Sequence, residues 1–182
     1  DGTGAFTGTE TSYPTYSSFG DLNGDGFVDM IAREMGVGLT VHLNDRGGNL
    51  VQTGVVSLPD VGYGRGLFED IDNDGDADFI YTSGETDEVP AGLRLNDGVG
   101  AMTGSGQTWA SVTLGSLCAG DLDNDGWVDV IFTDMRSQPE IWMNDGQGRL
   151  VDSGVRLEGP NSIKSCQIED LDGDGDEDIF VA

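Results

Sequence analysis

Basic residues and histidine are scarce in this sequence. Its 182 residues include eight Lys and Arg against 34 Asp and Glu, so the formal net charge is −26. This balance disfavours a nucleic-acid partner, because binding a phosphate backbone requires a cationic surface. The one histidine, His42, alternates with Val41 and Leu43, and we expect it on a strand with its side chain facing solvent. Without a partner constellation it gives no support to Ser-His-Asp or Cys-His catalysis, and we expect that this chain is not an enzyme, while the question stays open for a longer parent protein.

Long apolar runs and abundant cysteines are also lacking. No run of 18 apolar residues occurs, which predicts no membrane-spanning helix and no membrane insertion. No initiator Met and no signal peptide stand at the start, so we expect a processed chain or part of a longer one. The two cysteines fit a secreted protein with one bridge or an intracellular protein with none, and do not decide the compartment.

Acidic residues are instead concentrated in four loops of nine residues. Each loop has oxygen-bearing side chains at positions 1, 3, 5 and 9 and a glycine at position 6, and the copies recur at spacings of 49, 51 and 49 residues. Together they hold 18 of the 34 acidic residues, which favours metal binding over a diffuse acidic coat. The loops are residues 21–29, 70–78, 121–129 and 170–178.

This loop pattern predicts calcium sites. Ca²⁺ takes six to eight oxygen ligands at about 2.3–2.6 Å, and a tight loop of alternating Asp or Asn can surround one ion. The glycine permits a left-handed turn, after which the carbonyl of position 7 can add a ligand. We therefore expect about four structural Ca²⁺ ions, one per loop. The expected ligands are Asp21, Asn23, Asp25, Phe27, Asp29, Asp70, Asp72, Asp74, Asp76, Asp78, Asp121, Asp123, Asp125, Trp127, Asp129, Asp170, Asp172, Asp174, Asp176 and Asp178.

Four other interpretations of the acidic loops agree less well with the sequence than calcium-binding loops do. Acidic turns without metal would bring carboxylates together with no compensation. An EF-hand requires Glu at position 12, where this chain has Ala32, Tyr81, Phe132 and Val181. Thrombospondin-type arrays space such motifs more closely and contain more cysteines. A magnesium site suits a flexible carboxylate cage less well than a calcium site does.

Strand signals surround every loop. A short apolar segment precedes the loop, a β-rich run such as 30–32 follows it, and an alternating third strand such as 39–43 ends in Asn-Asp. The Asn-Asp-Gly triplets at 96–98 and 144–146 are typical of hairpin turns, and a fourth strand follows. Four short antiparallel strands per unit of about 50 residues, with no helical period, predict an all-β fold of β-propeller blades.

The repeats span the chain as a single β-propeller region, 1–182, but do not complete a ring. Fifteen strands are expected, and the last repeat lacks its third strand. We therefore expect either an excerpt of a larger propeller or a unit that associates with other chains through open blade edges. The expected repeats are 1–9 (the last strand of a preceding blade), 10–56, 57–106, 107–156 and 157–182, the last incomplete.

The loops, their following aliphatic strands and the later Asn-Asp-Gly triplets resemble FG-GAP and VCBS repeats. These are the calcium-binding blades of integrin α-subunit propellers and of many bacterial surface and secreted proteins. The segment 19–21, Phe-Gly-Asp, carries the Phe-Gly element, whereas the equivalent pairs are Phe68-Glu69, Ala119-Gly120 and Ile168-Glu169. No clear Gly-Ala-Pro element is present, so the bacterial VCBS type is the closer resemblance.

The resemblance implies a secreted or surface-displayed module that binds or adheres to a protein or carbohydrate ligand. In that family the cation loops lie on one face of the ring, and the opposite face meets ligands. One alternative is a non-catalytic propeller scaffold of a secreted carbohydrate-active enzyme. Another is a structural unit of a surface appendage. Aromatic residues near inter-blade loops could stack on sugars or fill gaps between blades; they are Tyr13, Tyr16, Tyr63 and Trp109.

The two cysteines can be placed on the expected blades. Cys118 lies three residues before its loop and Cys166 four residues before its own. This offset points them to opposite faces of equivalent innermost strands. Opposite faces of successive blades meet, so a bridge is possible if the Cα atoms come within about 7 Å. Two free buried thiols are the alternative.

Overall fold

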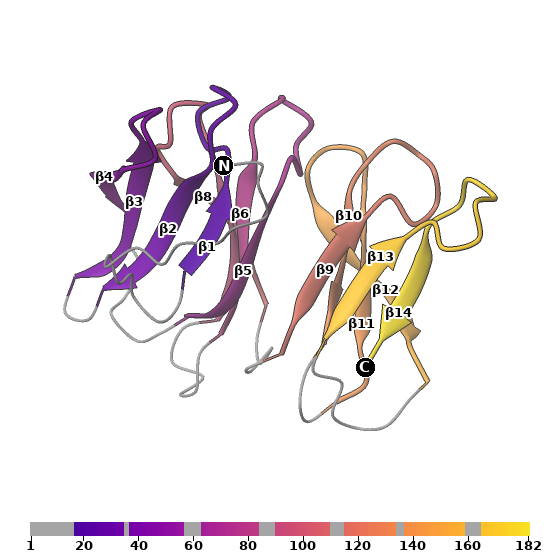
Figure 1. Ribbon diagram of the computed structural model, residues 1–182. Helices are drawn as coiled ribbons and strands as arrows, with labels where there is room; N and C mark the ends of the chain where they lie inside the picture. Colours follow the sequence, from indigo (N-terminus) through magenta and orange to yellow (C-terminus); the bar gives the residue numbers. More distant parts are fainter. Residues whose placement is uncertain are drawn as a thin grey trace.

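The computed structural model describes an all-β chain. The described residues are 17–34, 37–56, 63–83, 90–109, 115–133, 137–158 and 165–182. Within them the strands form three four-stranded antiparallel sheets and one two-stranded sheet (Figure 1). No helix in these ranges is long and apolar enough to cross a membrane. The expected strand within residues 1–9 lies outside the described part of the chain.

Each sheet follows the chain order of its strands. The first consists of β1 (Ser17–Gly20), β2 (Asp29–Glu34), β3 (Gly38–Asn44) and β4 (Leu50–Val56). The second consists of β5 (Tyr63–Glu69), β6 (Asp78–Ser83), β7 (Ala91–Leu95) and β8 (Thr103–Trp109). The third consists of β9 (Leu117–Gly120), β10 (Asp129–Phe132), β11 (Glu140–Asn144) and β12 (Leu150–Arg156). The last pairs β13 (Cys166–Glu169) with β14 (Asp178–Val181).

The sheets stand side by side through their first strands. β1 contacts β5, β5 contacts β9, and β9 contacts β13, as the succession of sheets in Figure 1 shows. This arrangement is consistent with successive propeller blades and confirms the predicted fold class. The described sheets do not close into a ring. β8 crosses the repeat boundary expected after residue 106, because the second sheet continues to Trp109.

The second strands of the second and third blades are buried on both faces. All six residues of β6 and all four of β10 are buried, since neighbouring sheets cover them from either side. Ile31 and Phe79 belong to the core between the first two sheets, and Ile80 and Phe132 to the core between the second and third. The first two sheets approach closely: a Cβ on Gly20 in β1 would lie 2.8 Å from the Cδ2 atom of Phe68 in β5, so only glycine fits.

The expectation for His42 was wrong. Its side chain is only 12% exposed, and its Nε2 hydrogen-bonds with Thr40 Oγ1 at 2.8 Å. β3 is a central strand between β2 and β4, and Met30, opposite His42, and Thr40 are both fully buried. Successive side chains of β3 point to opposite faces of the sheet, and both faces are covered. The alternating pattern therefore does not mark one face as exposed to solvent.

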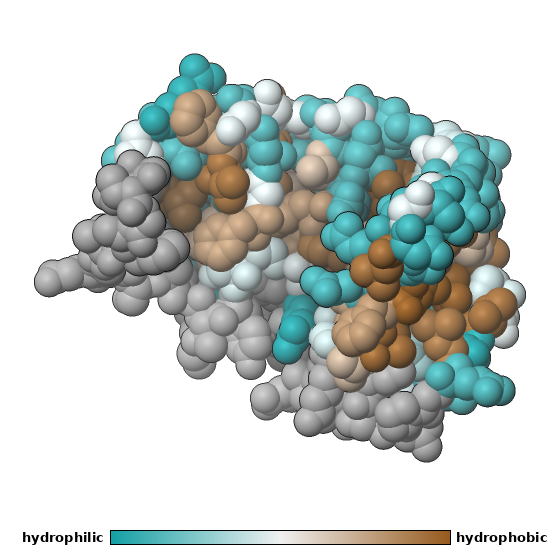
Figure 2. All heavy atoms as spheres, turned by 45° about the vertical axis from the view of Figure 1, so that its right-hand side comes forward, coloured by the Kyte–Doolittle hydropathy of each residue, from teal (hydrophilic) through white to brown (hydrophobic). Residues whose placement is uncertain are grey.

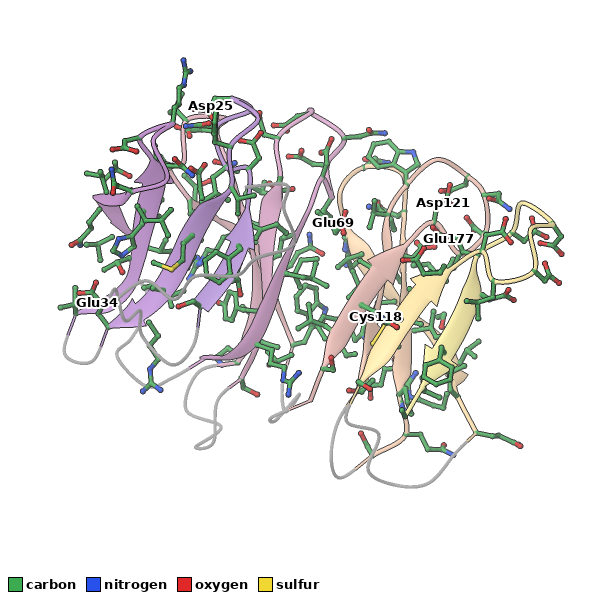
Figure 3. The ribbon with its side chains drawn as sticks, viewed as in Figure 1. Asp25, Glu34, Glu69, Cys118, Asp121 and Glu177 are labelled. Atoms are coloured by element: carbon green, nitrogen blue, oxygen red, sulfur yellow. A yellow bond between two sulfur atoms is a disulfide. The ribbon has the colours of Figure 1, made fainter. Side chains whose placement is uncertain are left out.

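The two cysteines form a disulfide. Cys118 in β9 and Cys166 in β13 are bonded, with their Cα atoms 5.7 Å apart. The structure thus decides between the two alternatives that the sequence left open. The bond joins the first strands of the third and fourth sheets, where Figure 3 labels Cys118. A disulfide of this kind is typical of proteins from oxidising environments.

Candidate metal centres

The four acidic loops each connect the first two strands of a sheet at the same end of the molecule (Figure 1). Figure 2 shows hydrophilic residues gathered at this end. The position-1 carboxylate closes each loop: Asp21 accepts the N–H of Asp25 (3.2 Å) and of Gly26 (2.8 Å). Asp70, Asp121 and Asp170 repeat both bonds. The backbone of each loop is therefore folded around its first aspartate.

The aspartate at position 9 fastens the loop to the sheet. Asp29 Oδ2 accepts the N–H of Leu22 (2.9 Å), and its Oδ1 accepts the N–H of Asn44 at the end of β3 (2.7 Å). Asp78 and Asp129 make the same pairs of bonds in the next two blades. These three carboxylates are almost completely buried. In the two-stranded sheet Asp178 accepts the equivalent bond from Leu171 and is exposed.

Three loops bring the carboxylates of positions 1, 3 and 9 together. In each triad one oxygen per residue lies within 4.8 Å of the others. The triads are Asp70, Asp72 and Asp78; Asp121, Asp123 and Asp129; and Asp170, Asp172 and Asp178. Carboxylate oxygens in this number and spacing could hold a hard divalent cation.

The other expected ligands lie outside these triads. In the first loop position 3 is Asn23, so an amide oxygen replaces the third carboxylate. At position 5 the aspartate turns toward its own loop, where Asp74 Oδ1 accepts the N–H of Asp76 at 3.0 Å. The side chain of Asp176 accepts a bond from Asn124 in the neighbouring loop. Ligation by positions 5 and 7 stays a prediction.

Electrostatics in the second loop favour a bound cation. Asp72 Oδ1 is buried and has no hydrogen-bond partner among the described residues. Burial raises the pKa of Asp78 to about 6, with added repulsion from Asp72 and Asp74. Burial, and then the charge of Asp74, also raises the pKa of Asp72. A cation at the triad would offset the repulsion and give Asp72 Oδ1 a partner, so the donor set fits a metal ion.

Two buried asparagines link neighbouring loops, a role that turn chemistry alone did not predict. Asn96 Nδ2 donates to the carbonyl of Leu22 in the preceding loop (2.8 Å) and to that of Ala77 in its own (3.1 Å). Asn144 Nδ2 bonds Ile71 (2.8 Å) and Val128 (3.3 Å) in the same manner. Both side chains are 6% exposed. The signal in the sequence was the recurrence of Asn at one place in three repeats.

The aromatic residues considered for ligand contact have different outcomes. Tyr13 and Tyr16 lie outside the described residues, and the side chain of Tyr63, at the start of β5, does too. Trp109 is 6% exposed, and its ring centroid lies 5.2 Å from that of Phe132 and 5.7 Å from that of Trp142. Trp109 therefore fills the space between the second and third sheets, which was the alternative role.

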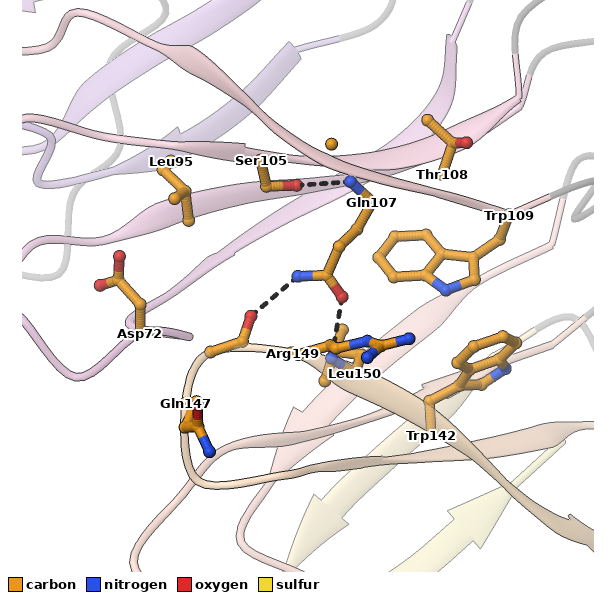
Figure 4. Close-up of a pocket in the computed structure, with 12 residues that line it drawn as sticks. Asp72, Leu95, Ser105, Gln107, Thr108, Trp109, Trp142, Gln147, Arg149 and Leu150 are labelled. Carbon is orange, nitrogen blue, oxygen red and sulfur yellow. Dashed lines mark hydrogen bonds between the residues drawn. The ribbon is translucent and has the colours of Figure 1, made fainter.

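A groove of about 670 Å³ lies between the second and third sheets (Figure 4). Asp72 lies at one end of it and the two tryptophans at the other. Gln107 spans the groove: its Nε2 donates to the Gly148 carbonyl (2.8 Å), and its Oε1 accepts the Leu150 N–H (2.9 Å). Gln147 and Arg149 line its edge. This groove is a second candidate site, beside the acidic loops.

The fold and the loops define a repeat protein whose four-stranded blades each carry an acidic loop between the first two strands. Three overlapping segments, residues 21–81, 70–132 and 121–181, match the family described as FG-GAP-like repeat. The chain therefore belongs to that family, which confirms the resemblance seen in the loops.

Comparisons with whole proteins give information about the fold alone. A search of curated proteins found no match. Among solved structures the chain is similar to a chain in the Tc holotoxin pore of Photorhabdus luminescens, with 18% sequence identity and a TM-score of 0.54. The match covers 92% of this chain and 8% of that one, so the chain spans a small part of that protein.

Proposed function

We propose that this chain is a calcium-stabilised β-propeller module of a secreted or surface-displayed protein, with a role in ligand binding or adhesion. The observation that carries the proposal is the set of three aspartate triads between the first two strands of successive blades. Calcium fits better than magnesium, because Mg²⁺ demands near-ideal octahedral geometry and keeps several waters, whereas Ca²⁺ accepts a flexible cage of carboxylates.

The structural role of the ion follows from the bonds around each triad. The position-9 aspartate already joins the loop to the third strand through an asparagine N–H. An ion on the triad would connect this aspartate to positions 1 and 3 of the loop, so one site would fix the first three strands. Calcium at 100 times its dissociation constant stabilises a folded domain by about 2.7 kcal/mol.

An extracellular setting is supported by the disulfide and by the expected affinity range. Disulfides persist in oxidising compartments. Calcium modules outside cells often bind at about 10⁻⁴–10⁻³ M, so such sites would be filled there and largely unfilled in the cytosol.

Ligand binding is supported by the groove between the second and third sheets. Its volume of about 670 Å³ is within the range of small-molecule sites. The amide of Gln147 and the guanidinium of Arg149 beside the half-buried Trp142 suit a ligand with both hydroxyl groups and an apolar face. We therefore favour a glycan as ligand. The connections at the opposite end, where the family meets ligands, lie largely outside the described residues.

Calorimetric titration of chelator-treated protein tests the calcium assignment. We expect about four ions per chain, and Asp72→Ala and Asp123→Ala, which remove the position-3 ligand oxygen, should each remove one. The matched control is Asp152→Ala, which removes an exposed carboxylate that pairs with Arg156 and belongs to no triad. Absence of binding heat, or equal losses in Asp72→Ala and Asp152→Ala, would contradict the assignment.

A glycan array in millimolar calcium tests the binding role. The wild type should retain a defined set of glycans, and the double variant Gln147→Ala/Arg149→Ala should lose them while unfolding at the same temperature. Arg156→Ala, at the other end of β12 and outside the groove lining, serves as the charge-matched control. No retained glycan, or equal loss in both variants, would reject the groove as a glycan site.

A further inference from the structure

The first acidic loop differs from the other three in charge and in contacts. It contains three acidic residues, whereas the later loops contain five, four and six. It also contacts a cationic side chain of its own chain: Arg46 Nε donates to Oδ2 of Asp25 at 3.2 Å. Figure 3 labels Asp25. The ion pairs of Arg156, in contrast, are with Glu140 and Asp152, which belong to no acidic loop.

The position of Arg46 is unusual for a residue with a side chain. Its φ is +64°, in the left-handed region that favours glycine. The equivalent turn residues of the next two blades are glycines, Gly98 (φ +74°) and Gly146 (φ +76°). Arg46 is held there by its N–H bond to Asn44 Oδ1 (2.9 Å), and its side chain is 68% exposed. The first blade thus tolerates backbone strain at a position from which a guanidinium reaches the loop.

We propose that Arg46 competes with the metal ion for Asp25 and makes the first loop the weakest calcium site of the chain. The inference rests on the proposed calcium function. Affinity of such sites depends on the number of charged ligands. The first loop starts with fewer carboxylates, one of them is engaged by Arg46, and the guanidinium repels a divalent ion.

The pairing predicts stepwise loading. The three loops with aspartate triads fill first, at lower calcium. Entry of an ion into the first loop requires Asp25 to leave Arg46, so that loop fills at higher calcium. An ion therefore stabilises the loop of the first blade only at calcium concentrations at which the other three loops are already occupied.

Glycine amides give a separate readout for each loop. The position-6 glycines, Gly26, Gly75, Gly126 and Gly175, each donate their N–H to the position-1 carboxylate of their own loop. Their amide signals in a nitrogen–proton NMR spectrum should therefore report loading site by site as calcium chloride is added. In the wild type we expect the Gly26 midpoint at the highest calcium concentration.

Two matched variants isolate the contribution of the guanidinium. Arg46→Gln should lower the calcium midpoint of Gly26 by roughly threefold to tenfold and leave the other three unchanged. Arg156→Gln removes the same charge from a pair with Asp152 and should change none of them. The effect of Arg46→Gln should shrink in 1 M KCl, because exposed charges are screened by salt. Asn23→Asp should tighten the first loop independently of Arg46.

Each outcome decides the proposal. A wild-type Gly26 midpoint equal to that of the other glycines overturns it, as does an Arg46→Gln variant that moves all four midpoints together or none. If no glycine responds to calcium, the proposed calcium function fails and the inference with it. If Gly75, Gly126 and Gly175 respond normally while Arg46→Gln leaves Gly26 unchanged, only the role of Arg46 fails.

Discussion

Single buried side chains connect the repeats more firmly than the loop pattern indicates. Asn144 is the clearest example, because its amide bonds two carbonyls that belong to different blades. The sequence predicted Asn144 as a turn residue, since Asn-Asp-Gly is typical of hairpins. Its partner Ile71 lies 73 residues away, so no local pattern could reveal the contact. The four acidic loops, in contrast, were predictable because all their defining residues lie within nine positions.

Replacement of Asn144 by alanine should destabilise the chain strongly. The substitution leaves the carbonyls of Ile71 and Val128 without their donor, and each buried group left unpaired costs about 1–3 kcal/mol. We expect a loss of about 2–4 kcal/mol in the free energy of unfolding, measured by urea denaturation in calcium. Asn44→Ala is the control: its amide bonds Val28 in an exposed setting, so its loss should be smaller. Equal losses would contradict the bridging role.

At the scale of strands and turns, the sequence predicted which elements exist better than where they begin. The sequence predicted a fourth strand after the Asn-Asp-Gly turn at 96–98, but β8 begins only at Thr103. The reason is that Asp97 Oδ1 accepts the Ala101 N–H at 2.9 Å, which extends the turn. The side of each strand that is buried was also hard to predict, as His42 shows, because blades are covered on both faces.

The disulfide between β9 and β13 links two strands of neighbouring sheets, and it can be removed by substitution or reduction. It closes a segment with a sequence separation of 48 residues. Constraint of the unfolded chain by such a bond is worth about 2–4 kcal/mol. The variant Cys118→Ala/Cys166→Ala should therefore unfold at lower urea, and a reducing agent should shift the wild type toward the variant. Reduction that leaves the wild-type midpoint unchanged, with both thiols titrated as free, would contradict this expectation.

At the scale of the whole molecule, we expect either a bound cation or bound protons to offset the repulsion between the acidic residues. The formal net charge is −26, and the largest concentrations of carboxylates are in the loops. Burial raises the pKa values of Asp72, Asp78, Asp129 and Glu69 above their usual range. Without a bound cation, the folded chain therefore takes up protons at a higher pH than the unfolded chain does.

Stability in the presence of a chelator should fall as the pH rises from about 5 to about 7. The folded-state pKa of Asp78 is about 6, above the unfolded value of about 3.9, so its stabilising protonation is lost through this window. We expect a decrease of about 1–3 kcal/mol in the free energy of unfolding, measured by urea denaturation at each pH. With saturating calcium the dependence should weaken or reverse, because the ion competes with protons. A chelated protein that becomes more stable toward neutral pH would rule this out.

The inter-blade bonds of Asn96 and Asn144 also bear on how such chains change in length. The second repeat carries both halves of the connection: its Asn96 amide reaches back to the carbonyl of Leu22, and the carbonyl of its Ile71, at position 2 of the loop, accepts the bond from Asn144. A duplicated or deleted unit of about 50 residues would therefore restore the same bond at its new junction. Duplication or deletion of a repeat could therefore change the number of blades without compensating substitutions at the new junction.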